Sequence, residues 1–577
     1  MLALLFAWVA FSVVWSEISY LTEVQSGIVG AAIAGYVLIR LVVDGAAVRN
    51  RLATAMVSLG LVLALAMFLQ IALGHRPEGP FLNINSAGAF LNLLWPLPAA
   101  AALLLPRKSA LALTSLGITG VMVFAAGLTG GRAVTLALIA AFIAVVVGSR
   151  AWARRRRLAA VTAIVLCALV LAQVTSQAMP AGESRNLGNR MATLSEPGTA
   201  GESRLRIWEG TWAMIQERPW LGWGPGTFFQ AYPAYRSPDD GSAGQHAHND
   251  YLQYWAEGGL PALALLLALF GVCGYRFVRS ATRPPVGEAE RVMVLAGGAA
   301  IAGAAVHALF SYNLQLLPML IVLGLAVGAL EAGSGAPAWL RIPIEPVRRR
   351  PLVALSFALL LAIPVTHLGT VAASAHYTQR GSEAMAGGEL QRAEDAFSTA
   401  ARLWPAQGLA RGFWADLYRQ ALESLPAREV ERRRALKQRG LELVAEAASR
   451  NPLRPLHALT RGRLLLQAPG ADLEAAERAF GHALELNPRT AAARVALTRL
   501  LVDQGRDEEA LAIVNAGFGP TYSERNNPAE LLRLGVRLRE GAGDHAGAVR
   551  LRDQLDAMQA RAASRSSNPP GAAEYGL

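Results

Sequence analysis

Long apolar stretches in the first two thirds of the chain constrain its fold more than any other feature. A helix that crosses a membrane needs about 20 mostly apolar residues. Eleven stretches approach or reach that length, at 2–16, 27–43, 53–74, 87–105, 110–128, 133–149, 158–175, 259–278, 292–310, 314–331 and 351–371. Charged residues make up 43 of the first 375 positions but 53 of the last 202. The sequence therefore predicts an all-α protein, with a polytopic membrane body over 1–371 and a soluble domain after it.

Basic residues distinguish the two sides of this predicted body. Alternate connections between the stretches hold 18 of the 26 basic residues in the first 375 positions, whereas the opposite short connections hold only Arg76 and Arg132. Cytoplasmic loops carry such an excess of arginine and lysine. We therefore expect the long loop 176–258, and everything after residue 371, to lie outside the cytoplasm. The formal net charge of +12 then reflects orientation in the membrane, and no nucleic-acid partner is expected.

Two features of the sequence narrow its chemistry further. Cys167 and Cys273 both lie in apolar stretches, so neither a disulfide nor a thiolate-bound zinc ion is expected. The first residues lack the basic segment and the small-residue cleavage site of a signal peptide. We therefore expect no cleaved leader.

The soluble domain contains a repeat. Asn-Pro pairs at 451–452, 487–488 and 527–528 recur at intervals of 36 and 40 residues, each followed by two amphipathic helical stretches around a Gly-containing turn. Period, turn and small-residue positions resemble tetratricopeptide repeats, which stack into an α-solenoid. We expect TPR-like helix pairs over 376–561, a disordered tail over 562–577, and a protein-binding rather than a catalytic role for the repeats.

The chemistry is expected in the loop 176–258. Its residues Gly222, Gly224 and Gly226 predict a tight turn, and such a turn is either a plain chain reversal or a cradle of backbone amides for phosphate. Further on, His246 and His248 flank Ala247. The two histidines fit a metal site with Asp250, a solvated structural pair, or a catalytic base, since histidine titrates near neutral pH.

Several motifs together resemble a known family. Arg204-Leu205 with Trp208, the segment 219–228, and His248-Asn249 followed by Gly259 and Ala262 resemble the O-antigen ligase / O-antigen polymerase superfamily of bacterial membrane glycosyltransferases. The family pattern usually has Gly where this chain has Ala262. The segments 75–91, with Asn85, and 128–138, with Gly131 in place of the usual Ser before Arg132, resemble two upstream family segments. The resemblance spans roughly residues 50–330.

This resemblance implies a GT-C-like membrane fold and a glycosyl transfer. The donor is an undecaprenyl-pyrophosphate-linked glycan, and the acceptor is a hydroxyl group on the periplasmic face of the bacterial inner membrane. The resemblance implies inversion at the anomeric carbon, with His248 as the base and with Arg132 and Arg204 as catalytic cations on the pyrophosphate. No metal ion or other cofactor is then needed. The alternatives are that Arg132 extends to the membrane interface and that Arg204 forms a surface salt bridge.

Further residues of the loop and of the upstream segment are expected to bind or orient the substrate. The residues in question are Asn249, Asp250, Arg206, His246, Trp208 and Asn85. His246 is a possible second base and ranks below His248. The aromatic residues of the loop either stack on sugar rings or belong to an interfacial belt; they are Trp208, Trp212, Trp220, Trp223, Tyr232, Tyr235 and Tyr251.

The acceptor separates three related activities. A ligase transfers polymer to the lipid A core, a polymerase extends glycan repeat units, and a protein O-oligosaccharyltransferase modifies serine or threonine. We expect ligase-type transfer. A transporter or receptor with a repeat-based interaction domain is the alternative from another class. Such a protein needs ionisable residues at mid-membrane, and in these spans only His307 and His367 stand out.

Overall fold

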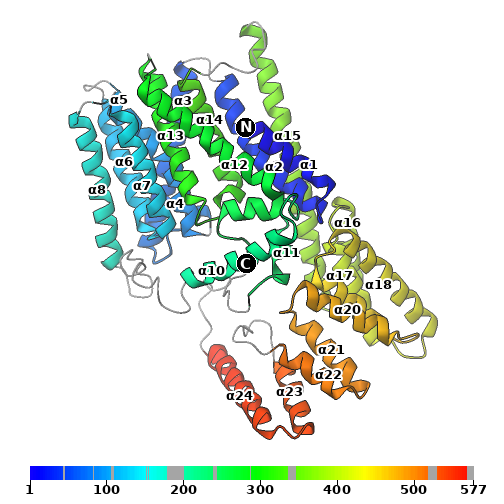
Figure 1. Cartoon of the computed structure of the whole chain (residues 1–577). Helices are drawn as coiled ribbons and strands as arrows, with labels where there is room; N and C mark the ends of the chain where they lie inside the picture. Colours follow the sequence, from blue (N-terminus) through cyan, green and yellow to red (C-terminus); the bar gives the residue numbers. More distant parts are fainter. Residues whose placement is uncertain are drawn as a thin grey trace. The chain divides into compact units, whose positions relative to one another are not determined.

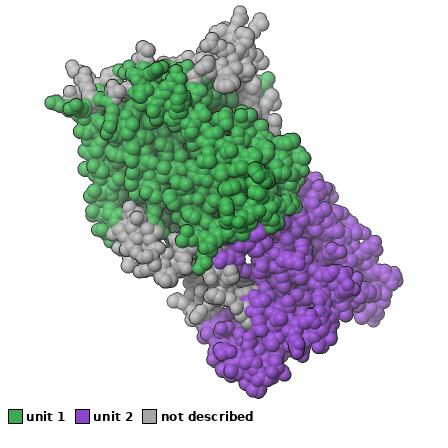
Figure 2. Space-filling view, viewed as in Figure 1, with its two compact units in different colours: residues 1–228, 244–365 green, residues 229–243, 366–577 purple. Residues whose placement is uncertain are grey.

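The computed structural model describes most of the chain, and every element within the described residues is a helix (Figure 1). The described residues are 1–42, 46–81, 83–105, 110–150, 153, 155–178, 200–237, 244–285, 287–335, 346–517 and 529–567. The chain divides into two compact units (Figure 2). Unit 1 comprises Met1–Phe228 with Gly244–Val365, and unit 2 comprises Phe229–Ala243 with Thr366–Leu577.

Unit 1 contains the apolar helices. They are α1 (Leu2–Phe11), η1 (Ser12–Val14), α2 (Ser19–Val37), η2 (Leu38–Val42), α3 (Ala46–Ala72), η3 (Gly79–Phe81), α4 (Ile84–Leu94), α5 (Pro96–Leu104), α6 (Ala110–Leu128), α7 (Arg132–Ser149), α8 (Arg155–Ala178), α10 (Ala200–Glu217), α12 (Asp250–Thr282), α13 (Glu288–His307), η6 (Asn313–Gln315) and α14 (Leu317–Gly333). The helix α15 (Pro346–Ala386) begins in unit 1 and ends in unit 2.

Eight helical segments in the described part of the chain are long and apolar enough to cross a membrane, and two shorter apolar segments, Leu2–Val14 and Leu317–Gly333, accompany them. These ten segments correspond to ten of the eleven predicted stretches. The eleventh, 351–371, lies inside α15, where the structure describes the helix but few of the side chains. The all-helical polytopic class is confirmed, and the number of spans stays a prediction.

Helix α13 lies at the centre of unit 1, where it packs against α4, α5, α7 and α14. The neighbouring pair α2 and α14 approaches especially closely. A Cβ atom on Gly35 would overlap the backbone of Ile321, and one on Gly324 would overlap the backbone of Ala32. Small residues at such crossings let helix backbones touch, which is typical of membrane bundles.

Unit 2 consists mainly of helix pairs. Its helices are α11 (Phe228–Ala231), which begins at the last residue of unit 1, then η5 (Tyr232–Ala234), α16 (Leu390–Leu403), α17 (Leu409–Ser424), α18 (Val430–Arg450), α19 (Pro455–Leu465), α20 (Leu473–Leu486), α21 (Ala491–Asp503), α22 (Asp507–Asn515), α23 (Ala529–Gly541) and α24 (His545–Ser567). One contact recurs between paired helices, with Gly381 against the ring of Phe397 and Gly462 against that of Phe480. Such pairing of helices is what a TPR-like repeat predicts.

Two boundaries differ from the sequence prediction. Helix α15 runs unbroken through the expected domain border at 371–376, because no proline or glycine cluster interrupts it there. Helix α24 continues to Ser567, into the expected disordered tail. The Asn-Pro pair at 527–528 and residues 568–577 lie outside the described residues.

Candidate active site

The two loop histidines lie directly before the N-terminus of α12. Asn249 is the N-cap of this helix, and its Oδ1 accepts hydrogen bonds from the backbone N–H of Tyr251 at 3.0 Å and of Leu252 at 3.2 Å. His248 has a φ of 52°, in the left-handed region that few non-glycine residues adopt and in which histidine is enriched. The cap and this backbone conformation fix the direction in which the half-buried side chain of His248 projects from the backbone.

The His246–His248 segment is held from several parts of unit 1. The indole N–H of Trp208, on α10, donates to the carbonyl of Ala247 at 3.0 Å. Gln253, on α12, accepts from the N–H of Ala247 at 3.2 Å, and its amide nitrogen lies 3.3 Å from Nδ1 of His246. These contacts give Trp208 a positioning role here.

Tyr312 packs against both histidines, although no motif in the sequence points to this residue. Its ring stacks on His246 with centroids 4.1 Å apart and meets the edge of His248 at 5.2 Å. Its hydroxyl accepts a hydrogen bond from Nδ2 of Asn83 at 3.0 Å. Tyr312 therefore links the histidines to the segment just before α4.

Arg204, on α10, lies within electrostatic range of His248 and of His307 at the C-terminal end of α13. Burial, with smaller contributions from the charges of Arg204 and His246, lowers the pKa of His248 to about 4. Burial likewise lowers the pKa of His246 to about 4, against the opposing effect of the hydrogen bond with Gln253. Both imidazoles are therefore neutral at neutral pH and can accept a proton.

Arg132 and Asn85 lie at two neighbouring helix starts. Arg132 is the first residue of α7 and Asn85 lies in the first turn of α4. A Cβ on Gly131, the N-cap of α7, would come within 2.6 Å of Oδ1 of Asn85, so the two starts are in contact. Asn83, the N-cap of α4, bonds to Tyr312. A continuous series of contacts thus runs from the start of α7 to His248.

Three residues predicted to bind substrate have other partners. The carboxylate of Asp250 is fully buried and accepts from the N–H of Leu314 at 3.1 Å, tying α12 to the connection between α13 and α14. Asp250 therefore packs inside the protein, and its predicted contact with the substrate stays a prediction. Asn249 acts as a helix cap, and Arg206 pairs with Glu209 at 3.4 Å on the exposed face of α10.

The glycine-rich turn uses its own amides. The N–H groups of Gly222, Trp223 and Gly224 donate to the carbonyls of Arg218, Ala256 and Glu257, at 3.1, 3.0 and 2.8 Å. The turn therefore packs against α12 as a plain chain reversal, because these three donors are not free to cradle a phosphate. Gly259, with a φ of 71°, kinks α12 at this contact.

The loop aromatics differ in their surroundings. Trp223 is buried and donates to the carbonyl of Met214 at 3.1 Å, and the hydroxyl of Tyr251 donates to Ala305 at 2.8 Å. Tyr232 is fully buried and Tyr235 half-buried, and both belong to unit 2. The indoles of Trp212 and Trp220 are 46% and 68% exposed, so these two retain free faces for a sugar ring or for the membrane interface.

Metal ligands do not assemble at the two histidines. Within the described residues, no three His, Cys, Asp or Glu side chains are grouped so as to hold a metal ion. The chemistry this arrangement offers is proton acceptance by a neutral histidine next to a fixed positive charge.

Two family models match the chain. Residues 117–267 match the O-antigen ligase model, and residues 471–519 match the model of a tetratricopeptide repeat. The first range includes Arg132, Arg204 and His248. A search among curated proteins gives no match.

Solved structures similar to the chain resemble about a third of it. The crystal structure of MamA protein is 13% identical, over 34% of this chain and 97% of that one, with a TM-score of 0.24. A thermophilic TPR protein in Thermus thermophilus is 17% identical (33% and 98% coverage, TM-score 0.25), and Pseudomonas aeruginosa pilF is 19% identical (33% and 93% coverage, TM-score 0.21). With the apolar helices, the family matches indicate a multi-pass membrane protein that carries an O-antigen ligase domain over residues 117–267 and a C-terminal tetratricopeptide repeat.

Proposed function

We propose that the chain transfers a glycan from an undecaprenyl-pyrophosphate carrier to an acceptor hydroxyl, as an O-antigen ligase does. The observation that carries this proposal is the juxtaposition of Arg204 with a neutral, half-buried His248 inside the O-antigen ligase domain. A neutral imidazole is a proton acceptor, and a nearby guanidinium binds the oxygens of a leaving pyrophosphate.

In this mechanism His248 takes the proton of the acceptor hydroxyl while the acceptor oxygen attacks the anomeric carbon. The bond from that carbon to the pyrophosphate oxygen breaks, and its electron pair stays on the leaving oxygen. The new glycosidic bond forms on the opposite face of the sugar, so the configuration inverts. The imidazolium then releases its proton to water, which returns the neutral base.

The leaving pyrophosphate gains negative charge in the transition state. Arg204 and Arg132 supply the compensating cations, since arginine stays charged at any working pH and binds phosphate in bidentate fashion. The adjacent N-termini of α4 and α7 add the positive ends of two helix dipoles. His246, stacked on Tyr312, would orient the site, and Asn85, in the first turn of α4, would contact the donor glycan.

The same proposal assigns sides of the membrane. The arginine bias of the connections supports a bacterial inner-membrane protein with the His248 side and unit 2 in the periplasm. There the helical repeats would bind an assembly partner or the acceptor itself, as repeat arrays commonly bind proteins.

A deletion strain tests the proposed function and identifies the acceptor. We expect truncated lipopolysaccharide by mass spectrometry, restored by the wild-type chain but not by His248→Ala or Arg204→Ala at equal membrane levels. Altered chain length would instead assign a polymerase, and loss of glycan from periplasmic proteins would assign a protein O-oligosaccharyltransferase. No change in any glycan would overturn the proposal.

The cation role of the arginines has its own test. Transfer should survive exhaustive chelation with EDTA, because Arg132 and Arg204 neutralise the pyrophosphate in this account. Strict dependence on an added divalent ion would contradict it.

A further inference from the structure

A cavity in unit 1 has a composition that the proposed transfer reaction does not use. It lies between α3, α4, α5, α13 and α14, has a volume of about 110 Å³, and is lined by 16 residues. Fifteen of these are apolar or glycine; Leu52, Met56, Leu93, Met293, Val322 and Leu325 are examples. Apolar cavities of about 150 Å³ stay dry and bind small hydrocarbons. This cavity therefore fits a segment of a hydrocarbon chain.

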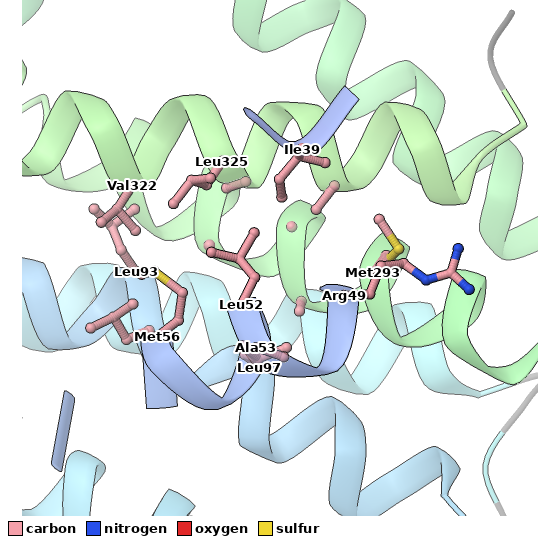
Figure 3. Close-up of a pocket in the computed structure, with 16 residues that line it drawn as sticks. Ile39, Arg49, Leu52, Ala53, Met56, Leu93, Leu97, Met293, Val322 and Leu325 are labelled. Carbon is pink, nitrogen blue, oxygen red and sulfur yellow. The ribbon is translucent and has the colours of Figure 1, made fainter. Parts of the chain in front are cut away.

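Among the residues that the structure describes, Arg49 is the single charged one that lines the cavity. Its side chain lies at one end, with the guanidinium directed away from the apolar residues (Figure 3). Arg49 also lies in the first turn of α3, where the helix dipole disfavours a cation and favours an anion. An anionic group at this end would compensate both the guanidinium and the dipole.

The cavity lies far from the candidate active site. Along α13, Met293 at the cavity and His307 near Arg204 are 14 residues apart, or about 20 Å of helix. Along α4, Asn85 and Leu93 lie toward opposite ends of the helix. Under the predicted orientation, Arg49 faces the cytoplasmic leaflet, whose anionic lipids attract basic groups. A ligand there is separate from the glycan donor at His248.

We propose that this cavity binds an acyl chain of an anionic phospholipid, whose phosphate pairs with Arg49. The apolar lining selects a hydrocarbon, and the guanidinium of Arg49 selects a negatively charged headgroup over a zwitterionic one. This inference does not depend on the proposed transfer reaction.

The test measures the binding of phosphatidylglycerol to the purified full-length chain by native mass spectrometry, alongside the shift in Tm. Arg49→Gln should weaken binding about fivefold, as expected for the loss of one basic group near anionic lipid. It should also abolish the preference over phosphatidylcholine. Arg51→Gln is the matched control, because Arg51 is exposed two residues further along α3 and should bind as the wild type does.

A second pair of variants tests the cavity itself. Ala53→Phe fills the cavity and should remove bound phosphatidylglycerol, whereas Ala55→Phe places the same ring on the exposed face of α3 and should leave binding intact. Size-exclusion profiles verify that each variant is folded. Equal binding by Arg49→Gln and Arg51→Gln would overturn the proposal. So would displacement of phosphatidylglycerol by equimolar undecaprenyl phosphate, which would assign the site to the carrier lipid.

Discussion

His248 owes its position to side chains from three separate parts of the chain. Trp208 and Gln253 hold the backbone of Ala247, and the ring of Tyr312 packs against both histidines. The position of the His248 side chain therefore depends on residues that need not touch the substrate. Such supporting residues commonly control activity through geometry.

Tyr312 gives the first prediction. Tyr312→Phe removes the hydrogen bond from Asn83 but keeps the ring, so we expect most of the kcat to remain. Tyr312→Ala removes the ring contact as well. An aromatic pair contributes about 0.5–1.5 kcal/mol, so kcat should fall about two- to tenfold relative to Tyr312→Phe. Equal activity of the two variants would show that the stacked ring does not position the histidines.

The pH profile gives the second prediction. The base must be neutral, so activity is lost as pH falls through its pKa. With a pKa of His248 near 4, kcat/KM should stay level from pH 8 to about 5 and decline near pH 4. The bound donor adds negative charge, which raises the pKa, so the acid limb of kcat should lie at higher pH. If kcat/KM fell to half its maximum near pH 6.5, the base would not have the lowered pKa that burial gives His248.

The order of the motifs was sufficient to identify His248, Arg204 and Arg132 as candidates. It could not predict the contacts that the residues around His248 make. Asp250 follows the motif histidine closely, yet its carboxylate is buried against Leu314. Tyr312 lies 64 residues after His248 in a short connection between helices. No local pattern signals such a contact, because it arises only when α12, α13 and α14 pack together.

At the scale of elements, the kink in α12 decides how the glycine-rich turn fits. Gly259→Ala should lower the Tm of the purified chain. The substitution places a side chain at a φ of 71° and against the backbone of Trp220; such strain costs about 1–3 kcal/mol. Gly271→Ala, on the same helix with open space around its Cβ, is the control and should be neutral or slightly stabilising. A Gly259→Ala variant as stable as the control would show that the kink is not required.

The repeats hold part of the long loop. Within unit 2, Nη2 of Arg489 donates to the carbonyl of Ser237 at 2.7 Å, and the amide of Asn451 lies 3.5 Å from that of Gln230. Both repeat residues belong to the Asn-Pro connections that define the period. These connections therefore bind the chain's own segment 229–237.

Arg489→Ala should loosen that segment. A hydrogen bond from a charged group contributes about 1.5–3 kcal/mol, so hydrogen–deuterium exchange of peptide 229–237 should accelerate about tenfold to a hundredfold. Arg478→Ala removes an exposed arginine that pairs within α20, with Glu474, and should leave the exchange unchanged. Identical exchange in the two variants would contradict the role of Arg489.

At the scale of the whole molecule, local patterns were sufficient for the class of fold. Apolar stretches predicted the membrane helices, and the Asn-Pro period predicted the paired helices of unit 2. Neither pattern could show that Phe229–Ala243 belongs to unit 2, since that assignment depends on contacts between distant segments. The unbroken α15 was also missed, because the hydropathy changes near residue 375 while the sequence over 371–376 holds no proline or glycine.

The role of His248 as the base is tested by the rate of glycan transfer. This rate is measured with the purified full-length chain, a lipid-pyrophosphate-linked glycan and its acceptor. His248→Ala should lower kcat by about 10²–10⁴-fold, the range for loss of a general base. His482→Ala, an exposed histidine of α20, should transfer at the wild-type rate. If His248→Ala, folded and membrane-inserted, transferred glycan within about twofold of the wild type, His248 would not be the base and the proposed site would be wrong.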